Sequence, residues 1–258
     1  MAWRRFHLPR QFRKDIMASS DILRLRINDL CKSFATVDEP LVVLNRLSLE
    51  LSGGDSLAIV GPSGSGKSTL LQIIGTLDRP DSGTLIIDDT DPFSLNDKQL
   101  AKFRNSNIGF IFQDHHLLPQ LNVLQNVLLP TIAFGKGTDD QVQRAHELIE
   151  SVGMTDRINH LPSELSGGQK ERVAIARSLV MSPSVILADE PTGNLDANTA
   201  GEMTTLLLDL QKQFGAILIA VTHSETLAAS MSQQRELVGG ALTGSSTGSS
   251  TGSSTTDQ

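Results

Sequence analysis

Short apolar runs alternate with longer stretches of helical periodicity over most of this chain. Four of the runs are continuous and have the length of a strand: residues 57–60, 108–112, 185–188 and 216–221. Continuous apolar runs separated by helical patterns are typical of a largely parallel sheet with helices packed on its faces. The pattern therefore predicts an α/β fold.

Each of the four runs is followed directly by polar residues. In chain order these are the glycine-rich segment 61–69, Gln113, the pair Asp189 and Glu190, and His223 after one threonine. Open parallel sheets bind ligands beyond the carboxyl ends of their strands. We therefore expect these polar groups to converge on one crevice.

The first of them fits the phosphate-loop pattern G-x-x-x-x-G-K-[ST]. It lies between a predicted strand and a predicted helix over residues 69–76, which is the context that the pattern requires. We expect Lys67 to reach the β- and γ-phosphates of a bound nucleotide and Ser68 to ligate Mg²⁺, with loop N–H groups facing the phosphates. The candidate nucleotide-binding residues are Gly61, Pro62, Ser63, Gly64, Ser65, Gly66, Lys67, Ser68 and Thr69.

The other strand ends offer the remaining groups for hydrolysis. Asp189 is placed to hold Mg²⁺ directly or through water, and Glu190 to polarise a water in line with the γ-phosphate as general base. His223 could bond the γ-phosphate, and Gln113 could ligate Mg²⁺ or orient the water. Each has a plainer alternative: a solvated turn for the acidic pair, the neighbour of a helix N-cap for His223 and a strand terminator for Gln113.

A second glycine-rich segment lies about a hundred residues later, at residues 165–169. Ser166 and Gln169 form a capping-box pattern at the start of a predicted helix over residues 170–181. A capping box does not require two glycines, whereas close approach of the backbone to an anion does. We favour an anion site here over a helix start alone.

Composition narrows the possible partners. The net charge of -7 argues against nucleic-acid binding, which depends on clustered Lys and Arg. The single cysteine, Cys31, cannot form an intramolecular disulfide, so the fold does not depend on an oxidising compartment. No apolar stretch approaches the roughly 20 residues that span a bilayer. A membrane role is therefore expected to come through a partner.

The two ends differ from the rest of the chain. Residues 1–20 are predicted to be a basic, disordered extension, unless the start codon is set too early and Met17 is the real start. Residues 241–258 are rich in Gly, Ser and Thr and are predicted to be a flexible tail. The globular domain is expected to span residues 21–240.

In order and spacing, these motifs resemble those of ATP-binding cassette (ABC) transporter ATPases, over roughly residues 22–240. The resemblance implies a P-loop NTPase (RecA-like) core with a small antiparallel β-subdomain and an inserted α-helical subdomain at about residues 114–163. It also implies a head-to-tail dimer of two copies with two ATP molecules between them. Ser166 and Gly168 of one copy would then cover the γ-phosphate held by the other.

The same resemblance assigns two further residues. Asp196 would lie at the interface between the two copies. Phe34 would stack on adenine, where many relatives carry tyrosine; the chain has no tyrosine, so the π-face is kept and the hydroxyl is lost. The alternative for Phe34 is a plain core phenylalanine.

Two segments, 109–119 and 189–196, resemble the branch that contains lipoprotein-releasing, macrolide-export and cell-division ATPases. The run His-His-Leu-Leu-Pro at residues 115–119 is most similar to lipoprotein-releasing ATPases, in which it adjoins a groove for a cytoplasmic helix of the membrane subunit. The resemblance implies an ATPase that energises release of lipoproteins from the inner membrane toward a periplasmic carrier. It would sit at the cytoplasmic face through integral-membrane permease subunits. The run Gln169-Lys170-Glu171 and the residue Ser224 depart from common residues of this branch, and macrolide export and cell-division regulation remain alternatives.

Overall fold

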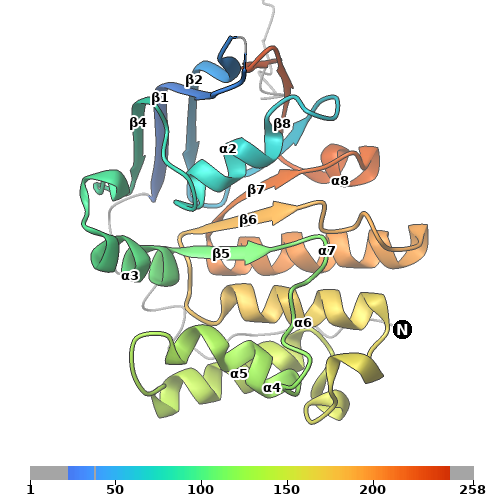
Figure 1. Ribbon diagram of the computed structural model, residues 1–258. Coiled ribbons are helices and arrows are strands. Elements are labelled where there is room, and N and C mark those ends of the chain that lie inside the picture. The colour runs from blue at the N-terminus through green and yellow to red at the C-terminus, as the bar shows by residue number, and fades with distance from the viewer. Residues whose placement is uncertain (1–22, 38, 245–258) are drawn as a thin grey trace, which may run out of the picture.

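The computed structural model describes residues 23–37 and 39–244. The predicted basic extension and all but four residues of the predicted tail lie outside these ranges. The described residues form two sheets with helices packed between and beside them (Figure 1). This is the mixed α/β architecture that the apolar pattern predicted.

The larger sheet has the strand order β5-β6-β7-β3-β8-β9. All neighbouring strands are parallel except the pair β8 and β9, which is antiparallel. All four predicted apolar runs match their strands to within one residue at each end. The strands are β3 (Ser56–Val60), β5 (Ile108–Ile111), β6 (Val185–Asp189), β7 (Ile217–Val221), β8 (Gln233–Val238) and β9 (Ala241–Thr243).

The smaller sheet is antiparallel and has the order β2-β1-β4. Its strands are β1 (Arg24–Phe34), β2 (Leu41–Ser52) and β4 (Ser82–Ile87), all from the first third of the chain. This is the small antiparallel β-subdomain that the resemblance implied. In Figure 1 it stands above the larger sheet, with helix α2 between the two.

Helices α4, α5 and α6 pack on one another beyond strand β5 (Figure 1). The α-helices are α2 (Lys67–Ile74), α3 (Asp97–Asn107), α4 (Val123–Leu128), α5 (Asp139–Ser151), α6 (Gly167–Leu179), α7 (Ala197–Phe214) and α8 (Glu225–Ser230). Short 3-10 turns lie at η1 (Pro92–Ser94), η2 (Leu129–Ile132), η3 (Thr155–Arg157) and η4 (Pro162–Glu164). Among the described helices, none is both long and apolar enough to cross a bilayer.

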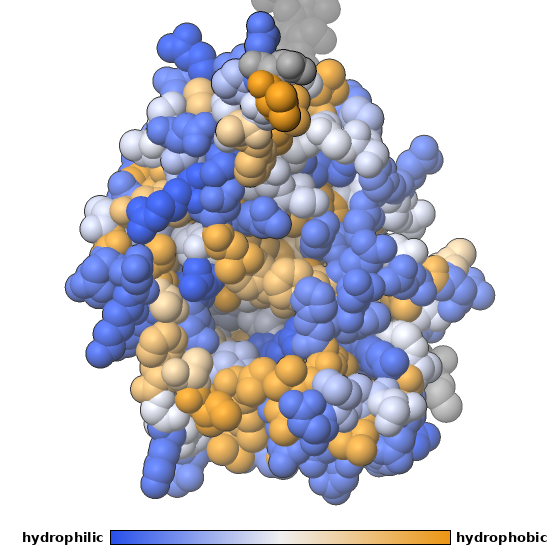
Figure 2. All heavy atoms as spheres, viewed as in Figure 1, coloured by the Kyte–Doolittle hydropathy of each residue, from blue (hydrophilic) through white to orange (hydrophobic). Residues whose placement is uncertain are grey.

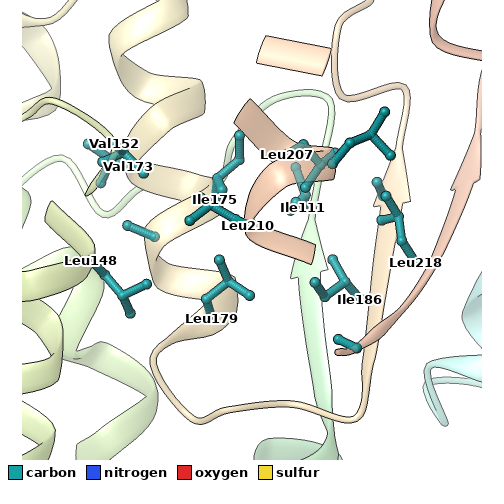
Figure 3. Close-up of a cluster of buried hydrophobic side chains, with 14 of the residues drawn as sticks. Ile111, Leu148, Val152, Val173, Ile175, Leu179, Ile186, Leu207, Leu210 and Leu218 are labelled. Carbon is teal, nitrogen blue, oxygen red and sulfur yellow. The ribbon is translucent and has the colours of Figure 1, made fainter. Parts of the chain in front are cut away.

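The hydrophobic core has two parts, one on each face of the larger sheet. Alternate residues of a strand point to opposite faces, so Ile186 joins one part and Leu187 the other. The first part is packed by α4 to α7 and includes Leu148, Ile175 and Leu207 (Figure 3). The second is covered by α2 and the small sheet. Burial on both faces explains why the strands are continuously apolar in sequence.

The predicted start of the tail at residue 241 is wrong. Residues Ala241–Thr243 form strand β9, which pairs with Glu236, Leu237 and Val238 of β8. Leu242 packs against the core at this edge, and Asn45 donates a backbone hydrogen bond to Gly240 at 2.9 Å. These contacts order a segment whose composition alone suggested flexibility.

Candidate functional site

The carboxyl ends of β3, β5, β6 and β7 open on one cleft of about 600 Å³. The polar groups that were predicted to converge on one crevice line this cleft. Val43, Gly193 and Val221, which the sequence did not single out, line it as well. The lining residues are Val43, Ser63, Gly64, Gly66, Lys67, Ser68, Thr69, Gln113, Asp189, Glu190, Gly193, Val221 and His223.

The phosphate loop leads directly into α2, which begins at Lys67. Gly64 and Gly66 have left-handed φ of 78° and 99°, which glycine adopts without steric cost. A Cβ on Gly66 would stand 2.8 Å from Val43 Cγ1, so the approach of β2 also requires glycine there. No side chain caps α2, which leaves the N–H groups of its first turn available to an anion.

Lys67 is buried, and its side chain reaches back to the start of the phosphate loop. Its Nζ donates hydrogen bonds to the carbonyl oxygens of Gly61 and Pro62, both at 2.9 Å. These two contacts place a cationic group at the floor of the cleft, beside the N-terminus of α2. A polyphosphate in the cleft would meet both sources of positive potential.

Glu190 is anchored to the end of β7. Its Oε2 accepts from Thr222 Oγ1 at 3.2 Å and from the His223 N–H at 3.1 Å, and His223 Nε2 lies 3.7 Å from its Oε1. Its backbone N–H donates to the Val221 oxygen at 3.0 Å, and its φ of 48° is in the left-handed region. A non-glycine residue in this region is held by its surroundings, so the carboxylate has a fixed position. Thr222 was not singled out in the sequence, although it directly precedes His223.

Asp189 is half-buried at the end of β6. Burial, and secondly the charge of Glu190, raise the pKa of this carboxyl, while Lys67 lowers it. A bound cation would offset the first two effects. Its carboxylate, the Ser68 hydroxyl and the Gln113 amide all line the cleft and offer the oxygen ligands that Mg²⁺ prefers, so the residues present fit that ion.

Gln113 follows β5 and is paired with Asn194. Asn194 Nδ2 donates to the Gln113 backbone oxygen at 3.2 Å, and Gln113 Nε2 lies 3.5 Å from Asn194 Oδ1. The loop that follows β6 therefore fixes the Gln113 segment from one side. The sequence placed Asn194 in a motif but gave no signal for this contact, which joins positions 81 residues apart.

The second glycine-rich segment starts α6 with the predicted capping box. Ser166 Oγ accepts from the Gln169 N–H at 3.3 Å, and Gln169 Oε1 accepts from the Ser166 N–H at 2.9 Å. A Cβ on Gly168 would lie 2.7 Å from Thr199 Cγ2, so packing against α7 also requires this glycine. Neither Ser166 nor Gly168 lines the cleft described above.

Two further predicted residues lie on the surface. Asp196 caps α7, because its Oδ2 accepts from Thr199 Oγ1 at 2.7 Å and its Oδ1 accepts from the backbone N–H groups of Asn198 and Thr199. These hydrogen bonds lower the pKa of the carboxyl, and the bond from the Thr199 hydroxyl contributes most. Phe34 is 42% exposed, with Lys32 Nζ 5.2 Å from its ring centroid. This exposure rules out the plain core alternative.

A second hollow of about 550 Å³ lies on a different part of the surface. Its lining is mostly apolar and comes from α3, β5, η2 and α6. Figure 2 shows apolar side chains gathered around a hollow between the region of α3 and the region of α4 and α5. The lining includes Leu77, Ala101, Arg104, Phe110, Phe112, His116, Leu129, Pro130, Phe134, Arg177 and Met181. We call it the apolar groove.

The ABC transporter family matches residues 44–193, which contain the phosphate loop, Gln113 and Glu190. The chain belongs to the ABC transporter family. Curated ABC relatives extend the likeness over most of the chain. The lipoprotein-releasing system ATP-binding protein LolD 1 of Rhodopirellula baltica is 61% identical over 84% of this chain and 95% of its own length. The LolD protein of Geobacter metallireducens is 47% identical over 84% and 96%.

Solved ABC cassettes have the same fold. The dimeric bacterial ABC transporter cassette MJ0796 is 38% identical, has a TM-score of 0.76 and aligns over 84% of this chain and 96% of its own. A second dimeric structure of MJ0796, in a post-hydrolysis state, is bound to ADP and Pi. The CbiO1 subunit of a Clostridium perfringens ABC transporter is 29% identical, also with a TM-score of 0.76. The P-loop ABC nucleotide-binding fold predicted from the motifs is confirmed.

Proposed function

We propose that this chain is the ATP-hydrolysing subunit of a transporter that releases lipoproteins from the inner membrane. The observation that carries the proposal is the 61% identity with a LolD protein over nearly that protein's whole length. The other LolD relatives, at 41% to 47% identity, support the same choice over macrolide export or cell-division regulation.

In this proposal ATP binds with its phosphates on the loop 61–69 and its adenine on Phe34. Ser68, Gln113 and Asp189 would hold Mg²⁺, and Lys67 with the first turn of α2 would balance the phosphate charge. Glu190, held by its contacts at the end of β7, takes the proton of the attacking water. His223 stands beside Glu190, where its ring can bond the γ-phosphate.

We further propose that the active form is a head-to-tail dimer. Ser166, Gly168 and Asp196 lie away from the cleft of their own chain, and Ser166 and Asp196 are exposed. A partner copy offering these groups to the γ-phosphate would complete the site. The dimeric MJ0796 cassettes support this arrangement.

The apolar groove is the proposed seat of a cytoplasmic helix from a permease subunit. An exposed apolar hollow of this kind is typical of a protein contact. Occupied in this way, it would hold the ATPase at the cytoplasmic face of the inner membrane.

The test is co-expression with the membrane proteins encoded beside this chain, followed by reconstitution in vesicles carrying an acylated lipoprotein. We expect co-purification and ATP-dependent release of that lipoprotein, with no release by a Glu190→Gln complex. Release of a macrolide instead, or stable assembly only with a cell-division membrane subunit, would overturn the lipoprotein assignment and leave the ATPase intact.

A further inference from the structure

The turn after Gln113 has an unusual backbone. His115 and His116 have φ of 61° and 47°, so two consecutive non-glycine residues lie in the left-handed region. Both residues are strained relative to ordinary backbone, because Cβ approaches the following carbonyl. The turn therefore needs contacts from elsewhere in the fold to keep this shape.

Helix α6 supplies those contacts. Arg177 Nη2 donates to the His115 oxygen at 2.6 Å, and Arg177 Nη1 donates to the His116 oxygen at 2.7 Å. Two donors of one planar guanidinium thus hold the carbonyls of both left-handed residues, in the fork geometry that lysine cannot reproduce. We call these two hydrogen bonds the arginine clasp.

A buried carboxyl supports the clasp from the same helix. Glu171 is 2% exposed, and its Oε2 lies 3.2 Å from His115 Nε2. The His116 ring in turn lies 4.7 Å from the ring of Phe112, the residue before Gln113. The turn is therefore held through its backbone by Arg177 and through both of its rings by Glu171 and Phe112.

Gln113 lies between two anchors as a result. Asn194 holds its backbone oxygen on the side of the cleft, and the arginine clasp holds the residues that follow it. Loss of one anchor would release strain in the turn and let the Gln113 side chain move, while the phosphate loop and Glu190 belong to other strands. We propose that Arg177 is a positioning residue for Gln113, acting through the carbonyl oxygens of His115 and His116. The inference rests on the proposed role of Gln113 at the Mg²⁺ ion.

A double-mutant cycle between Arg177→Met and Gln113→Ala tests it in the full-length protein. Both single variants should lower ATP turnover about tenfold, and the double variant should fall little further, because both remove the same placement. The Mg²⁺ concentration for half-maximal turnover should rise in Arg177→Met as in Gln113→Ala. Arg177→Lys, which retains one donor group, should lie between Arg177→Met and the wild type.

Arg172→Met is the matched control. Arg172 lies on the same helix and bonds the Val152 oxygen at 3.0 Å and Glu202 at 3.2 Å, outside the turn. In the double variant with Gln113→Ala, the fold-losses of ATP turnover from the two substitutions should multiply. The Mg²⁺ concentration for half-maximal turnover should stay unchanged in Arg172→Met. Should Arg177→Met fold poorly, the cycle is run with Arg177→Lys.

Two results would overturn the inference, and they differ in meaning. Full turnover in Gln113→Ala would refute the proposed role of Gln113 and the inference with it. If the fold-losses of ATP turnover in Gln113→Ala and Arg177→Met multiply in the double variant, the inference is refuted while the proposed role of Gln113 stands. Arg177 would then serve only the stability of α6.

Discussion

At the scale of single residues, Glu190 is the side chain with the most defined surroundings in the cleft. Three contacts at the end of β7 hold it, yet its carboxylate still lines the cleft. If it is the general base, Glu190→Gln removes the proton acceptor and keeps the hydrogen bonds that a Gln oxygen can still accept. We expect steady-state ATP turnover to fall by about a hundredfold or more while ATP binding persists.

The control for this variant is Glu225→Gln, which changes an acid in the first turn of α8 outside the cleft. It should keep wild-type turnover and wild-type ATP affinity. Comparable turnover in Glu190→Gln and in the wild type would refute the assignment of the base.

The buried carboxyl of Glu171 should make the stability of the protein depend on pH. Burial raises its pKa from 4.5 to about 8, although the nearby charge of Arg177 opposes this shift. Burial also lowers the pKa of the neighbouring His115, although a hydrogen bond with the Asp114 backbone opposes that shift. Because the folded state favours the protonated carboxyl, its stabilising effect is complete below pH 4.5 and is lost as the pH rises toward 8. Glu171→Gln cannot ionise and escapes this loss.

The measurement is thermal unfolding of wild type and Glu171→Gln at pH 5.5 and pH 8.5. Relative to wild type, the variant should gain on the order of 3 kcal/mol between these two pH values. Glu202→Gln, at an exposed partner of Arg172, should show the pH profile of the wild type. An unchanged difference between Glu171→Gln and wild type at the two pH values would contradict the raised pKa.

At the scale of elements, the strands that carry chemistry were the most predictable part of the fold. They are buried on both faces, so their sequences are continuously apolar and stop where the polar group begins. Strand β9 was missed because Ala241–Thr243 gains its order from pairing with β8, a contact that composition does not encode. The left-handed turn at His115 and His116 was missed for a similar reason, since Arg177, which holds it, lies more than sixty residues away.

A capping box at the N-terminus of helix α3 should stabilise the protein. Asn96 Oδ1 accepts from the Gln99 N–H at 3.0 Å, and Gln99 Oε1 accepts from the Asn96 N–H at 3.2 Å. Asn96→Ala removes this capping box and should cost about 1 kcal/mol, or about 3 °C in Tm, without changing ATP turnover. Asn96→Asp keeps the acceptor and should melt close to wild type. Equal losses in the two variants would show that the cap does not stabilise α3.

At the scale of the whole molecule, the two glycine-rich segments of one chain lie apart from each other. Its cleft holds the phosphate loop and the acidic pair, whereas Ser166 caps α6 outside that cleft. In the proposed head-to-tail dimer each ATP needs the loop of one copy and Ser166 of the other. Turnover should therefore depend on dimer formation, and defects in the two halves should complement each other.

Two variants test this complementation. Lys67→Ala disables the loop, and Ser166→Asp keeps an N-cap acceptor for α6 but places a negative charge against the γ-phosphate. Each homodimer should be inactive at both sites. Random mixing makes half of the dimers heterodimers, and each of these has one site built from an intact loop and an intact Ser166. The mixture should regain up to about a quarter of wild-type turnover if the two sites act independently. Turnover no higher than that of the separate variants would mean that Ser166 acts on the ATP of its own chain or not at all.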